Sequence, residues 1–400
     1  MKSIIYRLFF LYAVTILFWE CNKPKNTDNI TNNSITNITF DYQTNCLPFD
    51  SLFDDVFFVK LETTTNSLIG RISQILFVDG KIIVVDNEVA QNILVFAESG
   101  KFQNQIGTTG GGPMEYSRIN CVALHPDNSM IAVNDNTKQL KYYAMDGTFV
   151  KSSALPYETD NIEFLTDKII VSDCPSGNQI NKNEIYKVRF IISDISGKVY
   201  HSGFECFYSN NFTYTTQSPV KKFGNNIFYN PSYSDTIYRA DLHGVMPVYV
   251  FKMRDIPSLK IDKNINNKIL FDHHEKYPFF NGEWFDLENT VYVTFMASIS
   301  SWERFALYDK KQKKSFCCSG SLVNPVYLLW HTPKARYKDN YLVSAINAAE
   351  LLSLKDKFYA LKQNLPKGKE NMLDDLFRDL TEDENPVLFF YRVNIRQNDK

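Results

Sequence analysis

The feature that most constrains the fold of this chain is a hairpin that recurs along it. Each copy has an apolar strand-like run, a turn with glycine and a second strand-like run, and the turn glycines follow one another at intervals of 47, 50 and 47 residues. Glycine suits such turns because a tight hairpin turn needs a positive φ. A fifth copy, RFALYDKKQKKSFCC, carries Asp309-Lys310 at its turn. The four turn glycines are Gly100, Gly147, Gly197 and Gly244.

A second hairpin precedes each of these, and six copies of it occur. Two hairpins in each unit of roughly 50 residues are typical of the four-stranded blade of a β-propeller. The sequence therefore predicts an all-β fold, a six-bladed β-propeller with antiparallel blades. The turns of the leading hairpins are expected at Asp79-Gly80, Asp127-Asn128, near Asp167, Gly224-Asn225, Glu288-Asn289 and Asp339-Asn340.

The sixth unit differs from the others. Residues 348–385 show apolar residues at helical spacing and predict a small helical insertion near the C-terminus. Residues 386–393 then supply one strand, so this blade lacks its fourth. We expect residues 56–61 to fill the gap, because pairing the two ends of the chain closes the ring and removes a free sheet edge. The propeller is thus predicted to span residues 51–400.

The N-terminus is typical of an export signal. Lys2 and Arg7 precede an apolar stretch over residues 8–19 that is too short to span a bilayer comfortably. Cys21 follows, as in a bacterial lipoprotein signal, which the segment resembles except that Glu20 stands where that pattern has a small residue. We expect a signal peptide over 1–20 and a lipidated Cys21 with a flexible tether over 21–50. An uncleaved anchor or plain secretion is the alternative.

Several segments resemble the bacterial six-bladed β-propeller lipoproteins, which are related in pattern to NHL-repeat propellers. The resemblance covers roughly residues 55–396 and implies this fold and a location in the bacterial cell envelope, lipid-anchored to a membrane and facing the periplasm or the cell surface. It implies no particular activity. The carrying segments are Leu61-Glu62-Thr63, residues 82–86, Ser99-Gly100-Lys101, residues 107–116 and residues 385–388.

Charge and motifs limit the function classes. The chain has 43 Lys and Arg against 45 Asp and Glu, and its net charge of −2 argues against nucleic acid as a partner. The glycine-rich segment over residues 107–116 lacks the ending of a P-loop. His273-His274-Glu275 is the one ligand-like cluster, and its adjacent histidines would not share a face of a helix or strand. No pairing of a nucleophile with a base stands out, so we expect no catalytic residues, no bound metal and no cofactor.

The long loops are predicted to gather on one side of the disc, called here the loop-bearing face. In an antiparallel blade, the loop after the second strand and the crossover to the next blade lie on the same side. Loops carry function more often than their scaffold, so this face is the candidate binding surface. The long segments in these two positions are residues 174–184, 255–282, 316–334 and 348–385.

Polar and aromatic residues are expected on this face. The polar residues end second strands and suggest either a ring that holds a ligand or calcium, or residues that satisfy backbone donors in turns, and the second interpretation is favoured. Trp284 and Trp330 suggest either stacking platforms or covers of the blade rims. Arg118 is expected to point into the central channel, to grip a carboxylate or form an ion pair. The strand-end residues are Asp86, Asn134, Asp135, Asp173 and Asn230.

Besides an assembly scaffold, two function classes remain open from the sequence. The first is a cell-envelope lipoprotein whose propeller binds a glycan, a peptide or a protein without catalysis. The second is a metal-dependent propeller enzyme, similar to lactonases, hydrolases or lyases, with its site at the channel mouth. The absence of a recognisable catalytic motif favours binding.

Overall fold

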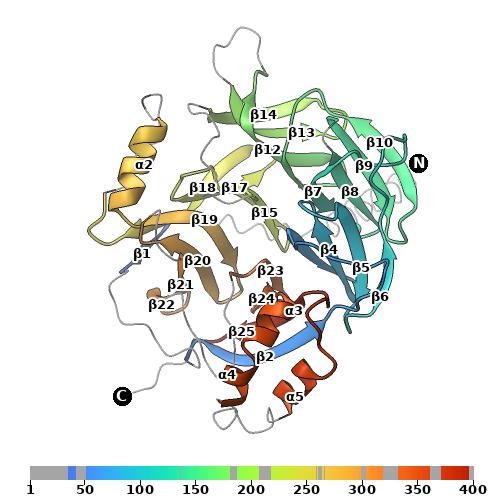
Figure 1. Ribbon diagram of the computed structural model, residues 1–400. Coiled ribbons are helices and arrows are strands. Elements are labelled where there is room, and N and C mark those ends of the chain that lie inside the picture. The colour runs from blue at the N-terminus through green and yellow to red at the C-terminus, as the bar shows by residue number, and fades with distance from the viewer. Residues whose placement is uncertain are drawn as a thin grey trace, which may run out of the picture. The chain divides into compact units, whose positions relative to one another are not determined.

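The protein is a ring of six β-sheets around a central axis, as the computed structural model shows (Figure 1). The structure describes residues 35–41, 51–135, 137–180, 187–206, 218–257, 259, 264, 266–298, 303–318, 332–360 and 371–395. The chain divides into two compact units, residues 1–35 and 36–400, and nearly all described residues belong to the second. The expected signal peptide, Cys21 and Trp330 lie outside the described residues.

Each sheet is one blade, and the prediction of a six-bladed propeller is confirmed. Within each of the first three blades the strands follow one another in chain order, all antiparallel. Blade 1 contains β3 (Gln74–Val78), β4 (Lys81–Asp86), β5 (Asn92–Ala97) and β6 (Phe102–Gln105). Blade 2 contains β7 (Ile119–Leu124), β8 (Met130–Asp135), β9 (Gln139–Ala144) and β10 (Phe149–Ala154). Blade 3 contains β11 (Asn161–Phe164), β12 (Ile169–Asn178), β13 (Val188–Asp194) and β14 (Val199–Glu205).

The remaining blades complete the ring. Blade 4 contains β15 (Val220–Phe223), β16 (Asn226–Tyr229), β17 (Thr236–Asp241) and β18 (Gly244–Met253). Blade 5 contains β19 (Phe279–Asp286), β20 (Thr290–Met296), β21 (Glu303–Asp309) and β22 (Lys314–Cys318). Blade 6 contains β23 (Ala335–Tyr337), β24 (Tyr341–Ile346), β25 (Val387–Val393) and β2 (Phe53–Lys60).

The hairpin turns follow from the chemistry of their residues. Asp79 and Gly80 have φ values of +46° and +72°, and two successive positive φ values match the right-handed twist of the strands they join. Gly100 has φ +87°, and a Cβ there would come within 1.9 Å of the carbonyl oxygen of Lys60. Position 100 therefore requires glycine, both for its positive φ and because the backbone of Lys60 in β2 comes so close.

The two ends of the propeller meet in blade 6. β2 pairs antiparallel with β25, with Phe57 opposite Phe390 and Lys60 opposite Val387. β2 is the outer strand of the sheet, whose order is β2-β25-β24-β23. The prediction that the N-terminal strand closes the last blade is therefore confirmed.

The segment expected to be a tether contains a further strand. β1 (Thr36–Phe40) pairs parallel with β18 and makes blade 4 five-stranded, with Ile38 opposite Phe251. Ile38 and Phe40 are fully buried in a core cluster that also contains residues of blade 5. Alternating polar and apolar residues give this strand one face to bury, which the expectation of a tether over residues 21–50 overlooked.

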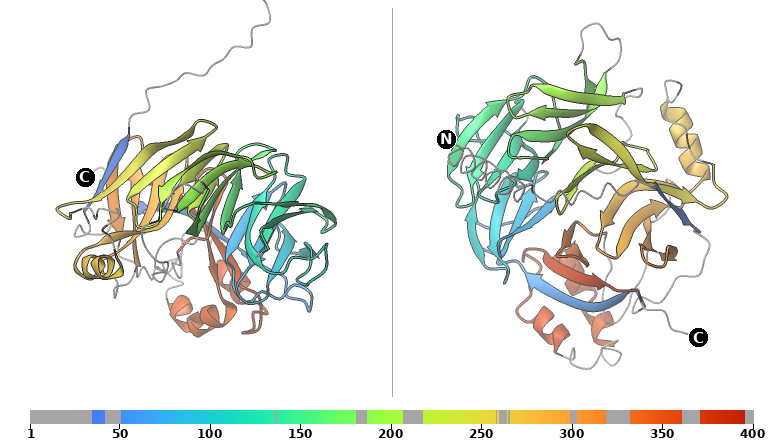
Figure 2. Two further views of the ribbon diagram at one scale, coloured as in Figure 1. Left: turned by 90° about the horizontal axis from the view of Figure 1, so that it is seen from above. Right: turned by 180° about the vertical axis from the view of Figure 1, so that it is seen from behind.

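Helices occur at two places in the described chain. α2 (Asn267–Lys276) lies between β18 and β19, and Asn266 caps it by accepting a hydrogen bond from the backbone N–H of Ile269. α3 (Ala348–Ser353), α4 (Lys355–Ala360) and α5 (Met372–Phe377) form the predicted insertion between β24 and β25. α2 lies in the crossover between blades 4 and 5, and α3 to α5 lie in the loop after the second strand of blade 6. Connections of these two kinds emerge on the same face of a propeller, and the edge-on view shows both helical regions toward the same side of the disc (Figure 2). No helix among the described residues is long and apolar enough to cross a membrane.

Candidate functional site

A cavity of about 830 Å³ lies along the axis of the ring and is called here the axial channel. Residues of the first strand of every blade, or of the turn after it, line the channel. These are β3, β7, β11, β15, β19 and β23, so the first strand is the innermost strand of each sheet. A cavity of this size accommodates a small molecule, and the axial channel is therefore the candidate site.

Side chains of the inner strands reach across to neighbouring blades. Lys221 on β15 forms an ion pair with Glu283 of blade 5, with 2.9 Å between Nζ and Oε2. Lys222, the next residue, donates to the carbonyl oxygen of Phe164 in blade 3 at 3.3 Å. Successive residues of a strand point to opposite faces, so these two lysines turn toward different neighbours. The polar lining thus also holds the blades together.

Arg336 makes the corresponding contact from blade 6. Its Nη1 donates to the carbonyl oxygen of Asp286 at 2.6 Å, and its guanidinium lies over the ring of Phe223, 5.8 Å from the centroid. A guanidinium has five N–H donors, and only the one on Nη1 has a hydrogen-bond partner among the described residues. Arg336 can therefore hold a ligand while it keeps its contact with blade 5.

The channel wall formed by blades 4 to 6 is positively charged. Among its lining residues, five carry a positive charge and two carry a negative charge, a local excess of three. With Arg71, Glu88 and Glu163 on the other side, the whole lining has six positive and four negative residues, an excess of two in a chain whose net charge is −2. The cationic residues are Lys221, Lys222, Lys334, Arg336 and Lys338, and the acidic ones are Glu283 and Asp339.

Glu163 on β11 faces this wall from blade 3. It lines the channel, and within the described parts of the chain its carboxyl has no hydrogen bond or ion pair. Burial raises the pKa of Glu163 to about 7, and the charge of Lys222 lowers it only in part. Near neutral pH the carboxyl is therefore present in both forms, as an O–H donor and as an anion.

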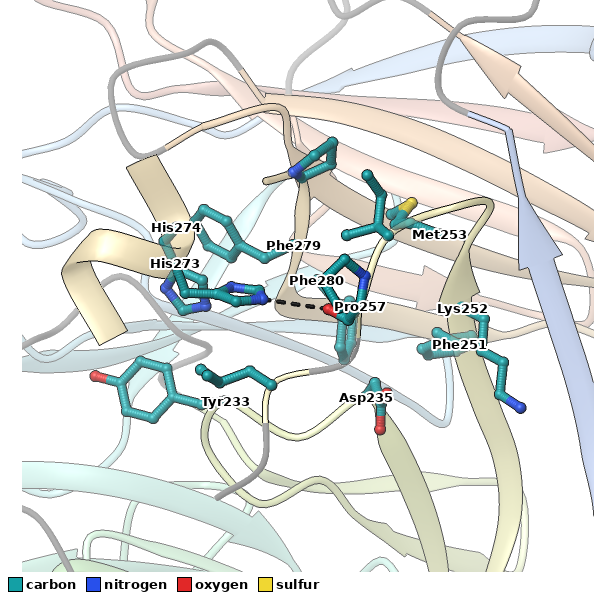
Figure 3. A pocket seen from close by; sticks show the side chains of 13 residues that line it. Tyr233, Asp235, Phe251, Lys252, Met253, Pro257, His273, His274, Phe279 and Phe280 are labelled. Atoms are coloured by element: carbon teal, nitrogen blue, oxygen red, sulfur yellow. Dashed lines mark hydrogen bonds between the residues drawn. The ribbon is translucent and has the colours of Figure 1, made fainter. Parts of the chain in front are cut away.

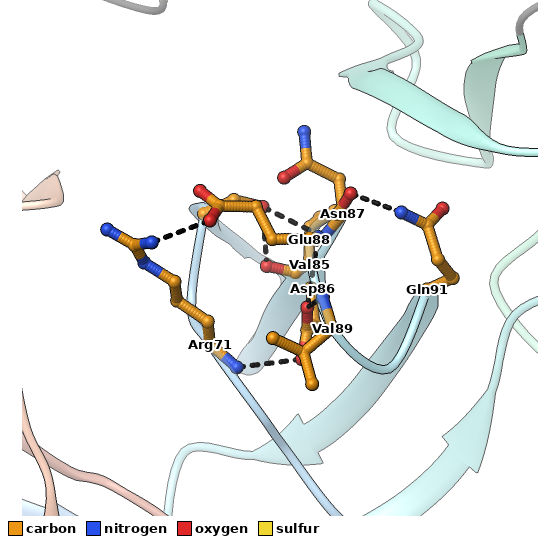
Figure 4. Close-up of polar contacts among 8 residues, drawn as sticks. Arg71, Val85, Asp86, Asn87, Glu88, Val89 and Gln91 are labelled. Carbon is orange, nitrogen blue, oxygen red and sulfur yellow. Dashed lines mark hydrogen bonds and ion pairs between the residues drawn. The ribbon is translucent and has the colours of Figure 1, made fainter.

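Asp86, at the end of β4, is held by the backbone around it (Figure 4). Its Oδ2 accepts from the N–H groups of Gly70 and Arg71 at 2.8 Å, and its Oδ1 accepts from those of Glu88 at 3.1 Å and Val89 at 2.8 Å. Burial by itself would raise the pKa of Asp86, but these backbone donors hold it below the ordinary value. The side chain is fully buried and its oxygens are occupied, which leaves it little capacity for a cation or ligand.

The other strand-end residues also have partners in the fold, but mostly of other kinds. Asp173 pairs with Arg189 at 3.2 Å and accepts from the hydroxyl of Tyr229 at 2.8 Å. Asn134 donates to the carbonyl oxygen of Thr159 at 2.6 Å. These contacts join blades 2, 3 and 4, and their partners are side chains and a carbonyl oxygen rather than the backbone donors of a local turn. Asp135 likewise pairs with Lys141 at 3.4 Å, and Asn230 donates to the carbonyl oxygens of Ser234 and Thr236.

The structure corrects two further expectations. Arg118 is exposed and is not among the lining residues of the axial channel. Trp284 is fully buried, because it lies within β19 and packs edge-on against Phe223 and Phe228, with centroids 5.2 and 5.4 Å apart. Trp284 is therefore part of the core and offers no stacking surface.

A second cavity, of about 60 Å³, lies beside α2 (Figure 3). His273 and His274 both line it, and the Nε2 of His273 lies 3.2 Å from the carbonyl oxygen of Pro257. His274 stacks on Phe279 with centroids 3.9 Å apart, and burial, followed by the nearby His273, lowers its pKa to about 4. Nowhere in the described ranges do three His, Cys, Asp or Glu residues gather so that they could hold a metal ion.

The residues that build the channel were not singled out from the sequence. A signal was present: the inner strands carry charged residues among apolar ones, in NIEF, VKKF, GEWF and ARY. Such charges on the innermost strand of a blade point to the axis or to the neighbouring blade. Their partners lie in neighbouring repeats, however, so the pairing depends on how consecutive blades pack.

Comparison with known families identifies the chain. Residues 35–392 match the model of a domain of unknown function, DUF4934. The chain belongs to this family. The matched range begins immediately before β1, so the family model includes this strand, which was expected from the sequence to belong to the flexible tether. A comparison with curated proteins finds no match.

Comparison with solved structures finds several similar chains. The crystal structure of a "putative exported protein" from Bacteroides fragilis NCTC 9343 is 20% identical, with a TM-score of 0.72 over 90% of this chain and 100% of that one. BamB from Moraxella catarrhalis is 12% identical over 65% of this chain and 66% of that one, with a TM-score of 0.39. The WD40 repeats of RRP9 are 10% identical over 88% and 99%, with a TM-score of 0.42. The first likeness supports the propeller fold, and the relation to NHL-repeat propellers remains a prediction.

Proposed function

We propose that this protein is a non-catalytic binding protein of the bacterial cell envelope and that it takes a small polar ligand into the axial channel. The observation that carries the proposal is the channel itself, about 830 Å³ in volume and lined by charged side chains of the inner strands. Arg336 and Glu163 keep donor or acceptor capacity that the fold does not use. A preformed cavity with a few convergent polar groups is the usual form of a small-molecule site.

The envelope location rests on the N-terminal sequence. The apolar stretch over residues 8–19 followed by Cys21 is typical of an exported lipoprotein, and a fold relative from Bacteroides fragilis is described as an exported protein. An acyl chain on Cys21 would contribute about 0.8 kcal/mol per buried methylene, so several chains hold a protein firmly on a membrane. The propeller would then act as a receptor at the membrane surface.

The test is a thermal-shift screen of the purified propeller against small polar compounds in three groups: anions, neutral sugars and peptides, and cations. We expect members of one group to raise the melting temperature of the wild-type protein. Ser218 lines the channel, and Ser218→Trp places a bulky ring there. The compounds that raise the melting temperature of the wild-type protein should not raise that of this variant. Equal binding to both proteins, or no binding at all, would overturn the channel as the site.

A further inference from the structure

We infer that the axial channel is an anion site, which takes a small organic ligand through a carboxylate or phosphate group held by Lys222 and Arg336. This inference rests on the proposed function and specifies the ligand class. Three observations carry it: the charge of one wall compared with the net charge of the whole chain, the donors that remain on Lys222 and Arg336, and the position of Glu163.

The first observation is electrostatic. Five positive and two negative residues line the channel on the side of blades 4 to 6, in a chain whose net charge is −2. A cavity lined by an excess of one sign concentrates ligands of the other sign, because its low-dielectric walls focus the field. The wall therefore favours anions over neutral or cationic molecules.

The second observation concerns which cations are free to act. Lys221 is already paired with Glu283 at 2.9 Å. Lys222 makes one hydrogen bond of 3.3 Å to a neutral carbonyl, and Arg336 makes one of 2.6 Å. Neither has an ion pair with a carboxylate in the described part of the chain, so each retains N–H donors for the ligand. Charge-assisted bonds of this kind, especially from a guanidinium, suit the planar or tetrahedral oxygens of carboxylate and phosphate.

The third observation is the position of Glu163 near Lys222, on the neighbouring blade. Lys222 faces it from β15, and from blade 2 the buried thiol of Cys121 on β7 and the ring of His125, which packs on Phe164 at 5.3 Å, lie close to its strand. In its protonated form Glu163 can donate its O–H to an anionic oxygen. In its ionised form it repels the same ligand, so affinity for the anion should fall as pH rises through neutrality.

The experiment compares named probes by calorimetry at pH 6. Succinate tests a carboxylate ligand and glycerol 3-phosphate tests a phosphate ligand, whereas glucose and putrescine represent neutral and cationic ones. We expect binding of at least one anion and none of glucose or putrescine. Lys222→Gln and Arg336→Gln should each lower the affinity for the anion by roughly tenfold or more, the effect of losing one charge-assisted contact. Lys101→Gln, an exposed lysine outside the channel, should have no effect.

Further variants keep the test decisive if a channel mutant is unstable. Lys338 lines the channel but is exposed, so Lys338→Gln should fold and should weaken anion binding by a few fold, more at low salt than at high salt. Between pH 6 and pH 8 the wild-type affinity should fall by roughly tenfold, and Glu163→Gln should flatten this dependence. His125→Gln should retain the pH dependence of anion affinity, which shows that the carboxyl of Glu163 rather than the imidazole of His125 causes it.

The outcomes separate this inference from the proposed function. If glucose or putrescine binds and Ser218→Trp abolishes the binding, the channel is a ligand site but the anion assignment is overturned. Unchanged anion affinity in both Lys222→Gln and Arg336→Gln would overturn it as well. If no probe binds and the screen of small polar compounds finds no ligand, the inference and the proposed function both fail.

Discussion

Phe57 and Phe390 stack face to face across the seam that closes the ring, with centroids 4.5 Å apart and planes 7° apart. One belongs to β2, near the start of the propeller, and the other to β25, near its end. Phe390 also packs edge-on against Tyr337 in the same blade, at 5.1 Å. The seam is therefore a well-packed part of the core.

We predict that Phe390→Ala lowers the free energy of unfolding by about 3 to 5 kcal/mol, because it leaves a cavity at the seam. Urea denaturation followed by circular dichroism measures this change. Phe271→Ala is the matched control, since Phe271 lies on α2 and is 43% exposed; it should change stability by about 0.5 kcal/mol or less. Equal effects of the two substitutions would contradict the importance of the seam.

Glu163→Gln should stabilise the protein at high pH. The pKa of Glu163 rises from an ordinary value of 4.5 to about 7 on folding, so the folded state binds more protons than the unfolded state between these values. The native carboxyl therefore costs stability progressively as pH rises from 4.5 to 7 and fully above it. We expect the variant to gain about 1 to 2 kcal/mol at pH 8, less than the full shift because the carboxyl contacts channel solvent, and nothing at pH 4. Denaturation curves at both pH values measure this.

His274→Phe should remove a loss of stability in acid. Burial lowers the pKa of His274 from 6.5 to about 4, so the unfolded state binds the extra proton as pH falls through this range. The neutral, buried His274 therefore costs the wild-type protein no stability above pH 6.5, and the free energy of unfolding falls as pH drops from 6.5 toward 4. The variant should therefore gain about 2 kcal/mol relative to the wild type on going from pH 7 to pH 4. Protonation of His274 lowers stability as pH falls, whereas ionisation of Glu163 lowers it as pH rises over nearly the same range. Melting curves of each single variant are therefore compared with those of the wild type at pH 7 and pH 4. If the stability difference between His274→Phe and the wild type is the same at both pH values, the prediction is wrong.

Asp86→Asn should destabilise the propeller without changing its response to calcium. The substitution replaces one carboxylate oxygen by an amide nitrogen, which leaves two backbone N–H groups without an acceptor. We expect a loss of about 2 to 3 kcal/mol. Thermal unfolding with and without calcium gives both quantities, and a calcium-dependent stabilisation lost only in this variant would point to a metal site.

Cys21→Ala should release the protein from membranes. If Cys21 is lipidated, its loss removes the acyl chains that hold the protein at the bilayer. Fractionation of cells that express each form, followed by immunoblotting, is the measurement. Cys206→Ala is the control, because Cys206 is a partly exposed cysteine of the propeller, far in the sequence from the signal segment, and its loss should leave the distribution unchanged. Retention of the Cys21→Ala protein in the membrane fraction would contradict lipid anchoring.

The fold could be predicted because its signals are local. Turn residues such as Asp79 and Gly80 fix a hairpin by their own backbone angles, and repetition of that hairpin identifies a blade. The strand missing from the last blade left residues 56–61 as the evident partner of the C-terminal strand. β1 escaped prediction because it pairs in parallel with β18, which is far away in the sequence, and no turn announces that pairing.

The candidate site was less predictable, because its chemistry depends on distances between blades. For Asp86 the sequence offered two interpretations, a ligand-holding group or an acceptor for turn donors, and the folded turn supplies the backbone N–H groups that occupy its oxygens. Conversely, Lys222 and Glu163 lie in different repeats, and only the packing of blade 4 against blade 3 brings them near each other. Trp284 was expected on the loop-bearing face, whereas it lies in the middle of β19 and is buried.

The parallel strand β1 also has a mechanical consequence. Five residue pairs link it to β18, and the backbone N–H of Arg254 donates to the carbonyl oxygen of Phe40 at its end. A pull on the chain ahead of Thr36 reaches β1 before it reaches β2, so this short strand bears the load first. The ring can thus stay closed under tension until β1 detaches from blade 4.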